Sequence, residues 1–323
     1  MSFPTFLKKL PGRETLLAAM VVAVALIFGI GHPDFLDPQN LSDRSRHWVE
    51  IGLIAVPMTF IIASGGIDLS VGSLLALAGI AAGKLQLAGL PLPAVIAGAL
   101  AVGTLGGLFN AFAIQAFRLP PLVVTLATLA LFRGLTYALT GAQPISTWPD
   151  AFTDWGSLGG WQVTEKIQVP WSFLILLGVV AIGTALFHRH LLGRQTRQLG
   201  ENASAARFAG ISAARITYAI YGFAGLMCGL SAIFWTSRFA TAHPGAAQGL
   251  ELEVIAVVVL GGTRITGGAG SVPGTFLGLL LLGLLRYGLE LRGVSQQDQT
   301  ILIGTLLIVV ALANEAWACR RSH

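Results

Sequence analysis

Long apolar stretches alternate with short polar connections along most of the chain. Ten stretches are candidate membrane-spanning helices, because about 20 consecutive, mostly apolar residues cross a bilayer. They cover residues 14–30, 48–64, 69–87, 92–117, 121–140, 169–187, 215–237, 250–262, 273–291 and 299–318. The short stretch 250–262 also fits a half-span or a re-entrant segment. The pattern predicts an all-α membrane protein, a polytopic bundle of about ten transmembrane helices that forms one domain over residues 1–323.

Composition excludes a soluble enzyme. Of the 323 residues, 54% are hydrophobic and 11% are charged, whereas a soluble domain usually carries about 25% charged residues. The net charge of +5 is compatible with nucleic-acid binding, but basic residues also mark the cytoplasmic loops of membrane proteins. The second interpretation fits better, so we expect no nucleic-acid partner.

The basic residues also predict an orientation. With the N-terminus in the cytoplasm, 12 of the 20 lysines and arginines fall on the cytoplasmic side and 6 on the other. The connection 188–215 dominates this bias, with five arginines and two histidines. Both termini are then cytoplasmic, and this favours an even number of spans, ten rather than nine.

The sequence carries no pattern for catalysis or metal binding. It lacks the phosphate-binding loop of ATPases, the HExxH and GxSxG motifs, and histidines at metal-ligand spacing. It also lacks a string of intramembrane carboxylates of the kind that proton-coupled carriers use as relays. We therefore expect no catalytic residue, metal site or cofactor in this chain, and the compact bundle of spans suits a transporter or channel. An ion-gradient-coupled secondary transporter is the alternative.

Two glycine-flanked segments interrupt the apolar pattern, and both are candidate gating elements. In the first, Gly65 and Gly66 permit an irregular turn, and the polar residues that follow precede a helix start. The second segment, 260–275, again joins a glycine pair to a helix start. The first segment has two interpretations, a helix cap at a broken span or a hinge on the translocation path. The candidate gating residues of the two segments are Gly65, Gly66, Asp68, Ser70, Ser73, Gly261 and Gly262.

Charged residues inside the spans need partners. Arg133 lies in the fifth predicted span, where it has three alternatives: to snorkel to the membrane surface, to pair with a carboxylate such as Asp68, or to face the pathway. We favour the structural pair. Arg286 and Glu290 are spaced for a local ion pair near a span end.

The basic connection 188–215 contains a short capped helix. Asn202 is a good N-cap, residues 203–209 follow as about two turns, and Gly210 suits the C′ position. So short a helix is marginal alone and needs a surface on which to dock. Phe208 offers an apolar anchor, while Glu201 and Arg207 offer polar contacts. The surface is either this protein's own bundle, the lipid interface or another protein.

This helix resembles the cytoplasmic coupling helix of sugar-type ATP-binding-cassette importer permeases, in the branch that includes ribose, rhamnose and autoinducer-2 systems. The resemblance also covers residues 65–73, 128–137 and 260–271, in order along the chain. Within the branch, residues 236–254 look closest to rhamnose-type permeases. The residues that the resemblance assigns to coupling with an ATPase are Gly200, Glu201, Asn202, Ala205, Ala206, Arg207, Phe208 and Gly210.

The resemblance implies a permease that forms the translocation pathway for a monosaccharide or a related small polar solute. It implies three protein partners: a cytoplasmic ATPase that binds ATP and Mg²⁺, an extracytoplasmic sugar-binding protein and a second permease chain, identical or paralogous. Together with the apolar spans, it places the chain among the lipids of the cytoplasmic (inner) membrane of a prokaryote, as a multi-pass protein.

Overall fold

The computed structural model describes residues 12–157, 159–164, 167–295, 297–302 and 304–305. The described elements, in chain order, are α1 (Arg13–Gly31), the 3₁₀ helix η2 (Pro33–Leu36), α2 (Pro38–Ala63), α3 (Val71–Leu87), α4 (Leu92–Ala116), α5 (Pro121–Thr140), α6 (Asp150–Ser157), β1 (Gly160–Thr164), β2 (Ile167–Pro170), α7 (Trp171–His188), α8 (Leu191–Glu201), α9 (Ala203–Phe208), α10 (Ala213–Phe239), α11 (Leu250–Leu260) and α12 (Val272–Leu291). The two strands form one antiparallel hairpin.

Seven of the described helices are long and apolar enough to cross a membrane: α1, α2, α4, α5, α7, α10 and α12. Helix α3 is apolar but shorter. The predicted span 250–262 contains only the 11-residue α11, which at 1.5 Å per residue covers about 16 Å and is too short to cross a bilayer. It therefore agrees with the half-span alternative. The predicted span 299–318 lies largely outside the described residues, as do the first 11 residues and the last 18.

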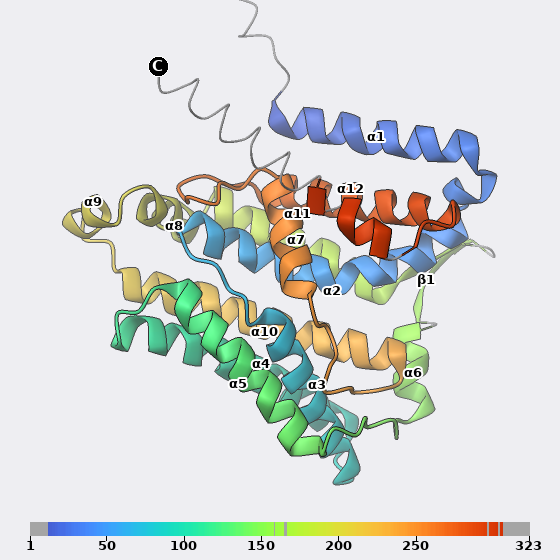
Figure 1. Cartoon of the computed structure of the whole chain (residues 1–323), viewed down its shortest axis with the longest axis horizontal. Coiled ribbons are helices and arrows are strands. Elements are labelled where there is room, and N and C mark those ends of the chain that lie inside the picture. The colour runs from blue at the N-terminus through green and yellow to red at the C-terminus, as the bar shows by residue number, and fades with distance from the viewer. Residues whose placement is uncertain (1–11, 158, 165–166, 296, 303, 306–323) are drawn as a thin grey trace, which may run out of the picture.

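The long helices form two groups that meet along α2 and α10 (Figure 1). Helices α7 and α12 pack on α2 on one side, and α1 packs on α12. Helices α3 and α4 pack on α10 on the other side, and α5 packs on α3 and α4. Helix α11 runs across the direction of α2 and α12 between these groups (Figure 1). Helix α2 lies at the centre and buries most of its apolar stretch.

Glycine faces bring α4 and α10 into backbone contact. A Cβ atom at Gly103 or Gly107 of α4 would overlap backbone atoms of α10, and Gly225 of α10 likewise faces Gly103. Glycines four residues apart allow this approach because they present no side chain. The spacing of glycines along these two helices therefore fixes how the second group packs.

The molecule has two distinct ends. Helices α8 and α9 lie at one end, which we call the α8–α9 end, together with the C-terminal ends of α2 and α7. The hairpin and α6 lie at the opposite end, near the start of α2 and the C-terminal ends of α10 and α12 (Figure 1). Ser42 of α2 donates a hydrogen bond to the carbonyl oxygen of Gln168 in β2 at this end.

Candidate functional site

The predicted short helix is present as α9. The Asn202 side chain accepts a hydrogen bond from the Ala205 amide at 2.9 Å, which caps the helix start. Gly210 follows the helix with φ of +77°, a left-handed conformation that glycine adopts without a Cβ clash. The sequence did not predict α8, which leads directly into α9 and is separated from it only by Asn202.

The surface of α9 divides into an inner and an outer side. Ala206 is buried, whereas Phe208 is 93% exposed, and Glu201 and Arg207 are also exposed. Among the described residues, the bundle therefore does not cover the Phe208 ring. Of the three expected docking surfaces for Phe208, this excludes the protein's own bundle and leaves the lipid interface or another protein.

Three segments far apart in the sequence meet through their backbones beside α8. The Gly268 amide donates a hydrogen bond to the carbonyl oxygen of Ala63 at 2.9 Å. A Cβ atom at Gly200 would overlap that same carbonyl oxygen and lie 2.8 Å from the Gly268 nitrogen. A Cβ atom at Gly267 would lie 3.0 Å from the Gly65 nitrogen. We call these five residues the glycine junction; it joins the coupling segment to both predicted gating segments.

The remaining glycines of the gating segments lie next to this junction. The Gly66 amide donates to the carbonyl oxygen of Ile61 and so continues the turn that ends α2. Gly261 ends α11 and packs against the backbone of Thr275 at the start of α12. The Gly262 carbonyl oxygen accepts a hydrogen bond from Arg13 at 3.2 Å, which ties the start of α1 to the same end.

Asp68 lies fully buried just before α3. Its Oδ1 atom accepts hydrogen bonds from the Ser70 amide at 2.8 Å and from the Ser70 hydroxyl at 2.7 Å. Asn110 of α4 donates to the Ser70 hydroxyl oxygen at 2.8 Å, and Ser73 donates to the Ser70 carbonyl oxygen at 2.9 Å. These contacts hold the non-helical segment before α3 against α4. The N-cap residue Ser70 makes no side-chain capping bond to α3, and the gating role stays a prediction.

Arg133 does not bond to Asp68, and this expected pair is wrong. Its guanidinium instead donates two 2.8 Å hydrogen bonds to the carbonyl oxygens of Pro244 and Ala246. These carbonyls belong to the connection between α10 and α11, whose backbone forms turns and a bridge between Ala242 and Ile145. Arg133 therefore serves to hold the approach to α11 in place.

The starts of α3 and α11 lie against each other. A Cβ atom at Gly72 would come within 2.5 Å of both the Ala247 carbonyl oxygen and the Glu251 Oε2 atom. Both helices are short and begin after non-helical segments. Short helices of this kind are typical of discontinuous spans in transporters, which line solute pathways.

The expected Arg286–Glu290 pair is also wrong, because each residue bonds elsewhere. Arg286 forms a two-point ion pair with Glu253 of α11, at 2.8 and 2.9 Å. Glu290 pairs with Arg44 of α2 at 2.7 Å. The sequence analysis also missed a buried pair between Glu50 of α2 and Arg238 of α10, at 3.0 Å. A signal for it was present, because Glu50 falls inside an apolar stretch, where a charge needs a partner.

Comparison with known proteins gives consistent matches over nearly the whole chain. The family model described as "Branched-chain amino acid transport system / permease component" matches residues 46–311. The autoinducer 2 import system permease protein LsrD of Photorhabdus laumondii is 36% identical over 307 residues, which are 93% of this chain and 90% of the relative. The protein of the same name from Klebsiella pneumoniae has the same identity and coverage. That from Escherichia coli is 35% identical over 327 residues, 97% of each chain. No solved structure matches the chain.

Proposed function

Because the chain belongs to the family of branched-chain amino acid transport system permease components, we propose that it carries solute through the membrane while a separate ATPase docks on α9. The chain is the permease subunit of an ATP-binding-cassette importer, a transport subunit rather than an enzyme. Its solute pathway serves a monosaccharide or a related small polar solute. The relatives named above import autoinducer 2, and this favours autoinducer 2 over rhamnose as the solute.

The exposure of Phe208 is the observation that carries the docking proposal. A helix of six residues does not hold its shape alone, yet this one is capped at both ends and presents an aromatic ring that is 93% exposed. A ring held outward in this way suits a pocket on a partner, because buried aromatic anchors supply much of the binding free energy at interfaces. Glu201 and Arg207 flank it with both signs of charge.

The glycine junction supports the transmission of movement from α9 to the pathway. Backbones in direct contact leave no side chain that could absorb a displacement, so a shift of α8 moves the end of α2 and the 260–271 segment with it. Those segments lead into α3 and α12 respectively. ATP-driven closure of the ATPases would thus rock the bundle between inward and outward access.

The remaining assignments follow from this arrangement. The α8–α9 end faces the cytoplasm, in agreement with the arginines of residues 188–215, and both termini lie on that side. An extracytoplasmic binding protein delivers solute to the opposite end, and a second permease chain completes the transporter. The complex lies in the inner membrane of a prokaryote.

Reconstitution with the ATPase subunit of the same importer tests the proposal. Vesicles that contain the permease chains and the ATPase should accumulate solute when ATP is supplied on the ATPase side and the binding protein on the other. A proton gradient alone should give no uptake. Phe208→Ala should abolish ATP-driven uptake and co-purification of the ATPase. Ile30→Ala, which truncates an apolar side chain on α1 that is 86% exposed, is the control and should change neither. Accumulation by this chain alone under a proton gradient would establish the secondary transporter instead.

A further inference from the structure

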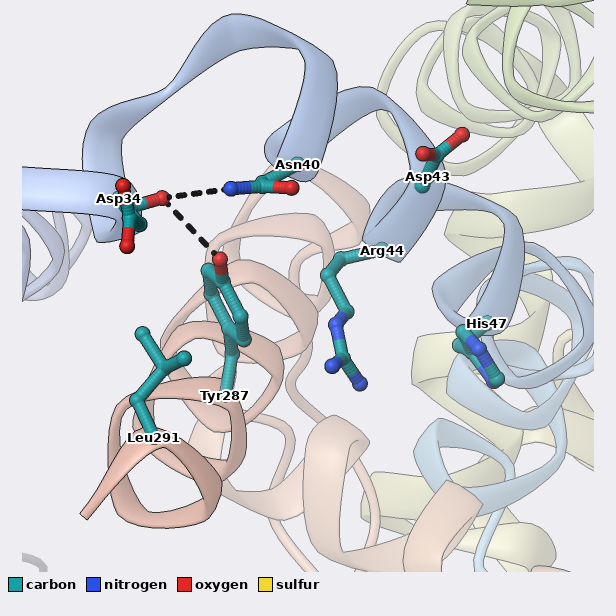
Figure 2. Close-up of a pocket in the computed structure, with 7 residues that line it drawn as sticks. All are labelled: Asp34, Asn40, Asp43, Arg44, His47, Tyr287 and Leu291. Carbon is teal, nitrogen blue, oxygen red and sulfur yellow. Dashed lines mark hydrogen bonds between the residues drawn. The ribbon is translucent and has the colours of Figure 1, made fainter.

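The opposite end of the molecule contains a cavity of about 590 Å³ between α2, α10, α11 and α12, which we call the inner cavity. Its volume falls within the range of small-molecule sites, about 300–1,000 Å³. A second hollow of about 490 Å³, the outer pocket, shares three lining residues with it, Arg44, His47 and Tyr287. Figure 2 shows the Arg44 side chain between Tyr287 and His47. The inner cavity thus continues into a mouth at the end of the molecule away from α9.

The mouth has a fixed framework. The Asp34 carbonyl oxygen accepts hydrogen bonds from Asn40 at 3.0 Å and from the Tyr287 hydroxyl at 3.2 Å (Figure 2). The Arg44 guanidinium lies 4.9 Å from the centre of the Tyr287 ring and pairs with Glu290. These contacts hold η2, α2 and α12 together around the opening.

The charged groups of the inner cavity balance. Its described lining contains three arginines and three glutamates, joined as the pairs Arg44–Glu290, Arg238–Glu50 and Arg286–Glu253. A wall with no net charge gives no advantage to an ion over a neutral molecule. Yet the paired groups still present donors and acceptors, because the Arg286 and Glu253 side chains are each 35% exposed.

Aromatic and apolar surface lies between these pairs. Trp48, Trp235 and Phe239 line the same cavity. A sugar-like molecule presents C–H groups on the faces of its ring and hydroxyl groups around it. Apolar side chains can contact the C–H groups, while the charged pairs hydrogen-bond to the hydroxyls.

One acceptor in the wall lacks a partner. The Glu50 side chain is 2% exposed, and its Oε1 atom accepts from Arg238, but its Oε2 atom has no hydrogen-bond partner in the structure. A buried, unsatisfied carboxylate oxygen is costly. A small rotation of the carboxyl group would turn this oxygen to a solute hydroxyl.

The floor of the cavity is α11. Leu250, Glu253, Ala256 and Val257 of this helix line it, and the end of α11 leads into the 260–271 segment that contains part of the glycine junction. A solute in the inner cavity therefore rests on the helix that connects to the coupling end.

We propose that the inner cavity is a binding site for a small, neutral, polyhydroxylated solute on its way from the outer mouth to the centre of the bundle. The Arg286–Glu253 pair and Glu50 supply its hydrogen bonds. Trp48 and the aliphatic lining residues supply its apolar contacts, because Arg238 lies over the Trp235 and Phe239 rings. This assignment rests on the proposed function and adds to it the location and the neutral character of the bound solute.

Protection of an introduced thiol tests the site. In a Cys228→Ala, Cys319→Ala background, Gln248→Cys places an exposed thiol on the cavity lining. Ser146→Cys places an exposed thiol at the same end but outside the lining. A membrane-impermeant maleimide is applied to the purified transporter with its ATPase, with and without D-ribose, L-rhamnose, autoinducer 2 or the anionic sugar acid D-gluconate.

We expect at least one neutral probe to slow modification at position 248 several-fold, with no effect at position 146 and none from D-gluconate. Glu253→Gln should weaken the protection while the ATPase still co-purifies. Absence of protection by every neutral probe, in a preparation that still shows ATP-driven uptake, would overturn the site and leave the proposed function intact. Equal protection at position 146, or stronger protection by D-gluconate, would also overturn it.

Discussion

The Gly268 amide donates a 2.9 Å hydrogen bond to the carbonyl oxygen of Ala63, and these residues are more than 200 positions apart in the chain. Gly200 packs against the same carbonyl oxygen. A movement at α8 therefore reaches the end of α2 and the 260–271 segment by direct backbone contact. This relationship connects a docking element at one end with the segments that lead into α3 and α12.

Gly200→Ala should uncouple the transporter. The added methyl group overlaps the Ala63 carbonyl oxygen and forces α8 away from the junction. Overpacking of this kind costs about 1–3 kcal/mol of folding free energy. We expect a lower unfolding temperature and a loss of ATP-driven uptake, with the ATPase still bound through α9. Gly178→Ala in α7, where no atom lies within 4 Å of the added Cβ, is the control and should transport normally.

Asp68→Asn should reduce transport without unfolding the protein. The asparagine oxygen still accepts from the Ser70 amide, but the side-chain amide places an NH₂ group where the carboxyl group had its second oxygen. We expect slower uptake at near-normal thermal stability. Ser64→Ala, which removes a local hydroxyl bond in the same connection, should leave uptake unchanged. If uptake by Asp68→Asn equals that of the wild type, Asp68 is only a dispensable cap.

Gly107→Ala should separate α4 from α10. The new Cβ overlaps the Tyr221 carbonyl oxygen, so we expect a loss of about 1–3 kcal/mol in unfolding free energy. Gly134→Ala lies on α5 in open space and should be neutral or stabilising by up to about 1 kcal/mol, because alanine favours a helix. Thermal unfolding in detergent compares the two. Equal effects would show that the α4–α10 contact is not close packed.

Arg133→Gln should loosen the connection between α10 and α11. The shorter amide loses the two bonds to the Pro244 and Ala246 carbonyl oxygens, each worth about 1–3 kcal/mol when the donor is charged. We expect faster hydrogen exchange in residues 245–250 and slower uptake. Leu126→Gln, on the exposed face of the same helix, is the comparison variant. Unchanged exchange at residues 245–250 would contradict the anchoring role.

The sequence predicted helix boundaries where neighbouring residues, such as proline, glycine and N-cap side chains, determine them. The expected stretch 121–140 coincides with α5, because Pro121 starts the helix and Gly141 ends it in a left-handed conformation. The stretch 92–117 differs from α4 by one residue. Asn202 and Gly210 identified α9 for the same reason, since caps are set by neighbouring residues.

Contacts between residues far apart in the chain could not be predicted from the sequence. Glu290 lies four residues from Arg286 and was the expected partner. Arg286 instead pairs with Glu253, because the packing of α11 on α12 brings these two side chains together. Arg133 found backbone carbonyls rather than a carboxylate, and no side-chain pattern marks such acceptors. The glycine junction joins three segments, and nothing in the sequence distinguishes its glycines from the many others in the chain. The contact among these segments could therefore not be predicted.

A thiol introduced at position 204 tests most directly whether a separate ATPase binds to α9. Ser204 is exposed on this helix, and Ser204→Cys changes its side chain by one atom. In a Cys228→Ala, Cys319→Ala background, we predict that an impermeant thiol reagent modifies position 204 in inside-out vesicles but not in intact cells, and that bound ATPase blocks the reaction. Modification from outside intact cells, or no protection by the ATPase, would contradict the account.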